Sequence, residues 1–117
     1  MQILITGKGM ELTEAIKEYA AKKIGALDKF FDGIIRAHVT VGLENHHHQK
    51  GAVFMAECKL EVPGTDLFAS KNEPTLYKAI DKIRDYLEGE LKKRKVKLRE
   101  PEKKARRLQR QTKEYTG

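Results

Sequence analysis

Disulfide bonds and long apolar segments are both missing from this sequence. Its one cysteine, Cys58, has no second cysteine to pair with, which is usual for a chain that works in a reducing compartment. The residues after Met1 hold no apolar run long enough for a signal peptide or a membrane span. We therefore expect a cytoplasmic protein, and its 117 residues suit one domain with a two-layer core.

Catalytic motifs are missing as well. The sequence has no glycine-rich phosphate loop and no nucleophile elbow, and Gly7-Lys8-Gly9 is too short to hold a nucleotide. Acidic residues are scattered among lysines, so no catalytic pair of carboxylates can be named. We expect a protein that is not an enzyme and that takes no cofactor and no small-molecule substrate.

Three adjacent histidines, His46 to His48, are the feature that most suggests a metal. Adjacent residues lack the spacing of roughly two to four residues that zinc ligands show, and Cys58 shares the alternation of the apolar core residues in its strand. A plain polar loop is the preferred interpretation, and no metal is expected.

Positive charge is concentrated at one end of the chain. Residues 1–91 carry 12 Lys and Arg against 14 Asp and Glu, whereas residues 92–117 carry 12 against 3, so a net charge of −2 is followed by one of +9. Each phosphate that Lys or Arg neutralises releases condensed counterions and adds salt-dependent affinity. The asymmetry favours a polyanionic partner, although a membrane surface or an acidic protein would also fit it.

Apolar spacing predicts one strand and one helix at the start of the chain. Residues 2–6 form a β-rich run that glycines close. Thr13 is a suitable N-cap, and apolar residues recur every three or four positions around it, which places them on one helix face. They are Leu12, Ile16, Tyr19, Ala20, Ile24 and Leu27. Asp32-Gly33 ends this unit.

Strict alternation predicts the strands that follow. Odd positions are apolar over residues 35–43 and even positions over residues 52–62, with a polar hairpin loop at residues 44–51 between them. Residues 63–66 form a turn by composition, and residues 67–70 form a shorter fourth strand.

The second helix begins near Pro74, whose missing N–H costs nothing in a first turn, and its apolar stripe continues to Leu91. We expect it to end at about Pro101, because the residue before a proline disfavours helical geometry. The sum is an α+β fold of two layers, β-α-β-β-β-α, with a four-stranded mixed sheet and both helices on one face. Residues 1–99 are the folded domain, and residues 100–117 are a basic tail too polar to order itself.

Lysines on the second helix are the first candidates for binding. Lys78, Lys82, Lys92 and Lys93 lie opposite its apolar stripe. A row of lysines on the solvent face of a helix usually does no more than keep the protein soluble. The run from Lys92 to Arg99 changes this interpretation, because six of its eight residues are basic and repel one another unless an anion joins them. Capping a helix end needs only about one or two cations. The run therefore favours polyanion binding.

The first helix adds lysines that are interrupted by acidic residues. Alone they predict a solvated mixed face, but beside the second helix they would widen a phosphate-binding track. The complete candidate set is Lys22, Lys23, Lys29, Lys78, Lys82, Lys92, Lys93, Arg94, Lys95, Lys97 and Arg99.

A series of motifs spreads over residues 1–99. They are Met1-Gln2-Ile3-x-Ile5-Thr6-Gly7, Leu12-Thr13-x-Ala15-Ile16, Lys22-Lys23-Ile24-x-x-Leu27, Phe31-Asp32, Val62-Pro63-Gly64-x-Asp66-Leu67-x-Ala69-Ser70, Tyr77-x-Ala79-Ile80-Asp81-x-Ile83 and Leu87-Glu88-x-x-Leu91-x-Lys93-x-Lys95-x-Lys97. In these motifs and their order the chain resembles the family of ribosome hibernation-promoting factors and ribosome-associated inhibitors, as a short form or as the N-terminal domain of a long form.

The resemblance implies a stress or stationary-phase translation inhibitor. It would bind small-subunit ribosomal RNA in the decoding channel, where it occupies the places of messenger RNA and of the A- and P-site tRNAs. No membrane is involved, and the protein would be a monomer off the ribosome. By matching position, the phosphate contacts would be Lys23, Lys29, Lys82, Lys93, Lys95 and Lys97, with Tyr77 packed beside them. Relatives often carry Lys and Arg where this chain has Tyr86 and Gly89, so the middle of the binding face is expected to be weaker.

Two other functions suit the same order of elements. A double-stranded RNA-binding module needs a basic cluster at the start of its final helix, where this chain has Asn72-Glu73-Pro74-Thr75. A protein-interaction domain would use the exposed sheet face and would depend only weakly on salt. That face is expected to carry Arg36, His38, Val53, Met55, Lys59 and Phe68.

Overall fold

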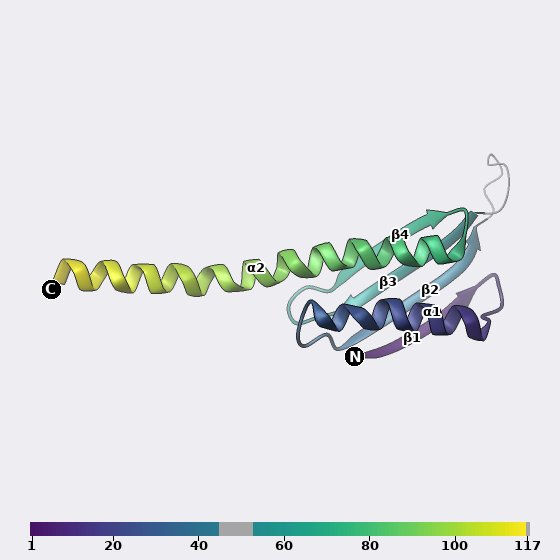
Figure 1. Ribbon diagram of the computed structural model, residues 1–117, viewed down its shortest axis with the longest axis horizontal. Helices are drawn as coiled ribbons and strands as arrows, with labels where there is room; N and C mark the ends of the chain where they lie inside the picture. Colours follow the sequence, from purple (N-terminus) through teal and green to yellow (C-terminus); the bar gives the residue numbers. More distant parts are fainter. Residues whose placement is uncertain (45–52, 117) are drawn as a thin grey trace.

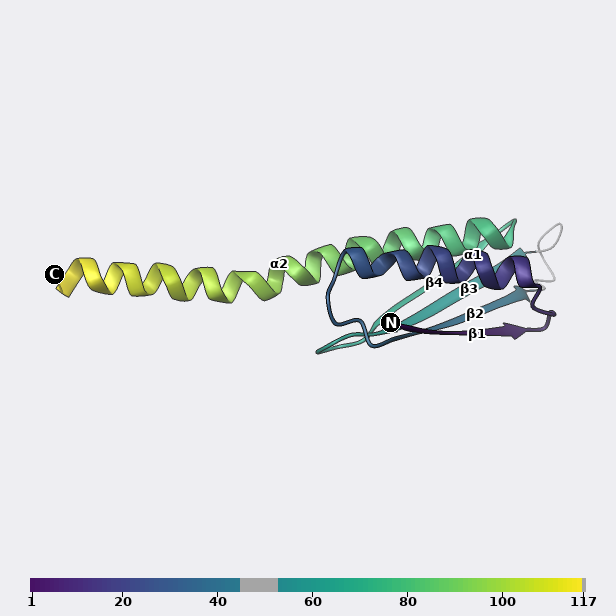
Figure 2. The ribbon, with the colours of Figure 1, turned by 60° about the horizontal axis from the view of Figure 1, so that its bottom comes forward.

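The computed structural model describes the backbone of residues 1–44 and 53–116, and within these ranges the side chains up to residue 96. The elements are β1 (Gln2–Lys8), α1 (Glu14–Gly25), the short 3-10 helix η1 (Ala26–Lys29), β2 (Arg36–Glu44), β3 (Val53–Glu61), β4 (Leu67–Glu73) and α2 (Leu76–Thr116). The strands form one sheet in the order β1-β2-β3-β4, and both helices cover the same face of it (Figure 1, Figure 2). The predicted α+β architecture is therefore confirmed.

The strand pairing brings one set of small apolar side chains under the helices. β1 pairs with β2 in parallel, and the other two pairs are antiparallel. In this register Val39 of β2 lies opposite Cys58 of β3, which lies opposite Ala69 of β4. All three side chains are buried. The alternation in the sequence therefore predicted correctly which side of these strands faces the core.

The core lies between the sheet and the two helices. On α2 it is formed by Ile80, Ile83, Leu87 and Leu91, each 0% exposed, which are the apolar stripe seen in the sequence. Burying one such side chain stabilises the fold by about 1.5–3 kcal/mol. No polar or charged residue is buried in the part of the chain that the structure describes, so the lysines in that part all reach solvent.

Threonine hydroxyls begin both helices. The Ile16 N–H donates to Thr13 Oγ1 at 3.2 Å, which confirms the predicted N-cap of α1. The Lys78 N–H donates to Thr75 Oγ1 at 3.2 Å, and α2 begins at Leu76. Pro74 therefore precedes the helix, and its predicted place in the first turn is wrong because Thr75 supplies the cap.

α2 continues past Pro101 to Thr116, so the predicted end at this proline is wrong. A proline removes one backbone donor and costs about 3 kcal/mol in a helix interior, but the helix can resume beyond it. In Figure 1 the C-terminal half of α2 extends away from the sheet as a single rod. The division into a domain of residues 1–99 and a tail of residues 100–117 stays a prediction.

Candidate nucleic-acid interface

α1 and α2 lie side by side on the sheet and run in the same direction (Figure 1, Figure 2). Tyr19 of α1 and Tyr77 of α2 meet edge to face, with ring centroids 4.8 Å apart and an interplanar angle of 85°. Tyr19 Oη also donates a hydrogen bond of 2.6 Å to Asp81 Oδ1 on α2. The helices therefore present one continuous outer surface, which is the arrangement that a wide phosphate-binding track requires.

Lys23 is fixed at the junction of the two helices. Its Nζ lies 3.8 Å from Asp81 Oδ1 and 5.5 Å from the centroid of the Tyr19 ring. The pKa of Tyr19 is raised to about 12, first because its hydroxyl donates to Asp81, then because burial and the Asp81 charge disfavour the phenolate. Of the candidate lysines, Lys23 is thus one that the fold holds in place.

Five of the candidate lysines are exposed and make no ion pair or hydrogen bond with another described residue. They are Lys22, Lys29, Lys78, Lys82 and Lys95. We call them the unpaired lysines. Two lie on α1 and η1 and three on α2, so both helices contribute to one positively charged surface. Without an anion nearby, such charges repel one another, which makes this surface suited to a polyanion.

Lys92 and Lys93 have partners on their own helix. Lys92 Nζ lies 3.6 Å from Glu88 Oε2 and 5.0 Å from the centroid of the Phe30 ring, and Lys93 Nζ lies 3.4 Å from Glu90 Oε1. Exposed ion pairs of this kind contribute only about 0–1 kcal/mol. A phosphate can therefore compete for both ammonium groups, and the predicted role of these lysines stays open to test.

Arg94 has a structural contact that the sequence did not indicate. Its Nη1 donates to the carbonyl oxygen of Pro63 at 3.2 Å, in the turn between β3 and β4. The side chains of Lys97 and Arg99, the last two candidates, lie outside the described side chains. Their backbone belongs to α2, whose C-terminal half extends beyond the sheet (Figure 1).

Lys71 is a cation near the candidate surface that the sequence analysis did not include. It lies on β4, and its Nζ sits 5.6 Å from the centroid of the Tyr86 ring on α2. Strand alternation alone could not reveal this, because the contact joins an edge strand to a helix. The one feature of the sequence that could have suggested Lys71 as a binding residue is its position on the last strand before a basic helix.

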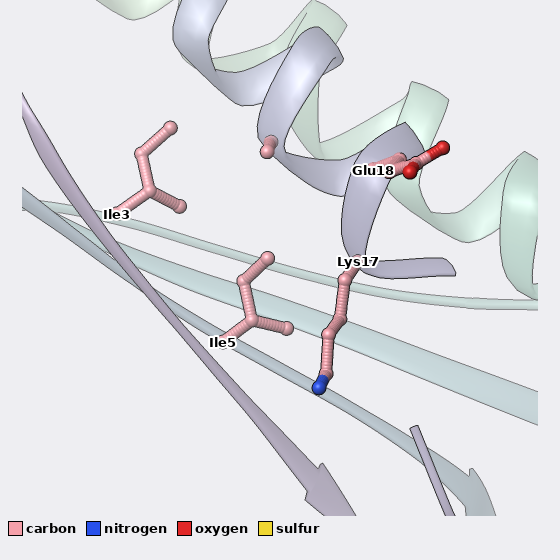
Figure 3. A pocket seen from close by; sticks show the side chains of 5 residues that line it. Ile3, Ile5, Lys17 and Glu18 are labelled. Atoms are coloured by element: carbon pink, nitrogen blue, oxygen red, sulfur yellow. The ribbon is translucent and has the colours of Figure 1, made fainter. Parts of the chain in front are cut away.

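A shallow hollow on the other side of α1 offers different chemistry. It has a volume of about 380 Å³ between β1 and α1, and its lining consists of Ile3, Ile5, Lys17, Glu18 and Ala21. In Figure 3, Ile3 and Ile5 point from β1 toward the helix. Lys17 at its rim pairs with Glu14 at 3.5 Å. This apolar hollow adds no free cation to the helical surface.

Neither cysteine nor metal chemistry gains support from the described residues. Cys58 is 0% exposed, as the alternation predicted, and burial raises the pKa of its thiol to about 12. Among residues 1–44 and 53–96, no group of three or more potential ligands is placed to hold a metal ion. His46 to His48 lie outside the described residues.

The sheet face away from the helices carries mostly paired charges. Glu61 lies 3.3 Å from Arg36 and 3.6 Å from His38. Phe68 is 57% exposed there, as the protein-interaction alternative expected, but Met55 is only 3% exposed. The prediction of an exposed Met55 is therefore wrong; its partners in the neighbouring strands are Gly42, which has no side chain, and Asn72.

Comparison with known proteins gives relatives over most of the chain. Residues 3–99 match the family described as Sigma 54 modulation protein / S30EA ribosomal protein. Over 100 residues the chain is 35% identical to the ribosome hibernation promoting factor of Escherichia coli K12, covering 86% of the chain and 99% of that protein. It is also 35% identical over 100 residues to the ribosome hibernation promotion factor of Deinococcus radiodurans, covering 83% of the chain and 51%, about half, of that longer protein.

Solved structures share the fold. The N-terminal domain of Thermus thermophilus Protein Y matches with a TM-score of 0.70 and 32% identity, over 80% of the chain and 98% of that domain. A ribosomal subunit interface protein from Coxiella burnetii matches with a TM-score of 0.69 and 23% identity, over 82% of the chain and 99% of that protein, which shows a common fold. In the described part of the chain, no helix combines the length and apolarity needed to cross a membrane.

Proposed function

The chain belongs to the Sigma 54 modulation protein / S30EA ribosomal protein family, and from this premise we propose that it is a ribosome hibernation factor that binds the small subunit. Its ligand is ribosomal RNA in the decoding channel. The bound protein occupies the places of messenger RNA and of the A- and P-site tRNAs, and it is a monomer when free. The family consists of ribosome-binding factors and not of enzymes, so inhibition requires no bond to be made or broken.

The observation that carries this proposal is the set of unpaired lysines on the surface shared by α1 and α2. Neutralising five phosphates would make the affinity fall roughly 500-fold between 50 and 200 mM salt. The paired cations Lys23, Lys92 and Lys93 lie on the same helices, and a phosphate can compete with their carboxylate partners. Binding strength is therefore expected to come mainly from phosphate contacts, which place the protein without reading a base sequence.

Co-sedimentation with purified ribosomal subunits at two salt concentrations tests the proposal. We expect the protein to sediment with the small subunit at low salt and to be released at high salt. The double variant Lys93→Glu, Lys95→Glu should lose binding while its thermal unfolding stays near that of the wild type, because both side chains are exposed.

A matched control separates the position of the charges from their number. Lys8→Glu with Lys17→Glu makes the same change in net charge, but Lys8 lies on β1 and Lys17 faces the hollow beside β1. This control should keep most of the affinity. Equal losses for the two double variants would reject the assignment to the end of α2.

Occupation of the decoding channel has its own test. Small subunits loaded beforehand with messenger RNA and P-site tRNA should bind less protein, since both would need the same space. Unchanged binding to loaded subunits would move the site elsewhere on the subunit while leaving subunit binding intact. A free RNA duplex serves as the comparison for the double-stranded RNA alternative, and equal affinity for the duplex would favour that alternative.

A further inference from the structure

Lys71 and Tyr86 bring β4 and α2 together at one edge of the helical layer. Lys71 Nζ lies 5.6 Å above the Tyr86 ring, and the Tyr86 residue is 46% exposed. No hydrogen bond or ion pair joins either side chain to another described residue. A large ring and a free cation are therefore held together at the surface, where neither is needed to complete the core.

Gly89 leaves open space beside this ring. It follows Tyr86 by one helical turn, and a Cβ placed on it would meet no atom within 4 Å. Side chains on a helix lean toward its N-terminus, so a side chain at residue 89 would cover the surface on the C-terminal side of the Tyr86 ring. With glycine there, that side of the ring stays uncovered.

Cations border the ring along α2. Lys82 lies one turn before Tyr86 and is unpaired, and Lys93 lies about 10 Å beyond it on the same side of the helix. The acidic residues of this stretch are already paired: Arg84 lies 3.1 Å from Asp85 and 3.2 Å from Glu88, and Lys93 lies 3.4 Å from Glu90. An aromatic ring that is open on the side of Gly89 and has positive charge around it is complementary to a polymer that carries flat bases on an anionic backbone.

We propose that Tyr86 is a stacking site for an unpaired nucleobase of RNA, with Lys71 and Lys82 binding the flanking phosphates. This inference rests on the proposed function, because it assigns one contact within the RNA-binding surface. Stacking of a base on an aromatic ring is stronger than the contact of an exposed lysine with such a ring. A base can therefore share the ring with Lys71 or displace it, and the released ammonium then reaches a phosphate.

The positive charges of Lys71 and Lys82 favour RNA over a protein as the partner that binds at Tyr86. An apolar side chain of a protein would gain from the ring but not from Lys71 and Lys82, whose charges it would have to desolvate without compensation. A phosphate backbone neutralises these charges and releases counterions as it does so. The protein-partner alternative becomes one outcome of the experiment, because it predicts that Tyr86→Ala weakens binding while Lys71→Ala leaves the salt slope unchanged.

The first experiment measures affinity for purified small ribosomal subunits. Tyr86→Ala should weaken binding by about 5- to 100-fold, and Tyr86→Phe should keep it, because the ring and not the hydroxyl does the stacking. Lys71→Ala should lower the slope of log affinity against log salt by about 1. Phe68→Ala is the matched control, since Phe68 is 57% exposed on the opposite sheet face, and it should have no effect.

Gly89→Leu separates binding from stability. Leucine is a better helix former than glycine and has room at this position, so the midpoint of thermal unfolding should rise. The added side chain would fill the space beside the ring, so the affinity should fall. A variant that is more stable but binds with wild-type affinity would overturn the stacking site, as would wild-type affinity in Tyr86→Ala.

The second experiment observes the ring directly. The chain has no tryptophan, so Tyr86→Trp introduces a single reporter whose emission a stacked base should quench. Quenching by small subunits is the expected result, and unchanged emission on bound subunits would reject stacking while the proposed function stands. If wild-type protein ignores small subunits, the proposed function fails. In that case the Tyr86→Trp variant is mixed with hexaadenylate. Quenching of its emission would support the stacking site, and unchanged emission would reject the stacking site as well.

Discussion

The guanidinium of Arg94 donates a hydrogen bond of 3.2 Å to the carbonyl oxygen of Pro63. This contact ties the end of the packed part of α2 to the turn between β3 and β4. At the next residue of this turn, Gly64 adopts a φ of +91°, and its Cβ position lies 3.6 Å from Arg94 Nη1. One residue of the basic run therefore stabilises the fold, although the sequence analysis included Arg94 among the residues that bind an anion.

Arg94 and Lys95 are expected to separate stability from RNA binding. Arg94→Ala should lower the free energy of unfolding by up to about 1 kcal/mol, because the Pro63 carbonyl loses its donor. Lys95→Ala should change it by less than about 0.5 kcal/mol, because Lys95 is exposed and unpaired. Urea unfolding of both variants measures the difference. Equal stabilities would mean that the Arg94 contact contributes nothing in solution.

How much the sequence could predict depends on the range of the interactions. The alternation around Cys58 and the cap at Thr13 are local patterns, and both were predicted correctly. The contact of Lys71 with Tyr86 joins elements that no local pattern relates, so it was missed. Because relatives often carry a basic residue where this chain has Tyr86, the sequence predicts a weaker binding face there. The structure places Lys71 of β4 beside the Tyr86 ring.

The same limit explains the prediction at Pro101. A proline disfavours helix locally, and this local rule correctly identifies a weak point, but the backbone on both of its sides is helical in α2. The candidate lysines show the converse. Their positions opposite the apolar stripe follow from helical spacing, whereas the pairing of Lys23 with Asp81 required the relative placement of two helices.

The Tyr19 hydroxyl is expected to make stability fall at high pH. Its pKa rises from 10.0 when unfolded to about 12 in the fold, so the protonated form is the one that the fold favours. The stabilisation is complete below about pH 10 and is lost as the pH rises toward 12. Thermal unfolding across this range should show a steeper decline for wild type than for Tyr19→Phe.

Ultraviolet absorbance of tyrosinate provides the control for this prediction. The difference between the titrations of wild type and Tyr19→Phe should have its midpoint near pH 12. A midpoint near pH 10 would mean that the hydrogen bond to Asp81 does not persist in solution, and the difference in stability should then vanish with it.

Cys58 should react slowly with thiol reagents while the protein is folded. The thiol is 0% exposed and its pKa is raised to about 12, so both access and the thiolate fraction are low at pH 8. In denaturant, one equivalent should react at once, since the chain has a single cysteine. Rapid reaction of the native protein would show that β3 opens far more often than its central position implies.

Residues 100–117 should contribute to RNA affinity but not to stability. Among the described side chains of α2, which reach residue 96, the last core residue is Leu91, so we expect a chain ending at Arg99 to keep its free energy of unfolding within about 0.5 kcal/mol. The removed segment carries six Lys and Arg against three Asp and Glu. Its loss should therefore weaken binding to small subunits mainly at low salt, and the salt slope should fall by about 0.9 for each phosphate contact that is lost.

Pro101→Ala in the full chain distinguishes a helical segment from a separate tail. If the helix of α2 is continuous in solution, alanine restores one backbone donor and the helical circular dichroism signal rises only slightly, because the segment is already helical. If residues 100–117 are unfolded when free, the substitution lets the helix extend, and the helical circular dichroism signal rises by an amount that corresponds to several additional helical residues. Adding small subunits to wild type would then raise the signal too, since RNA phosphates would remove the repulsion that keeps this basic segment from folding.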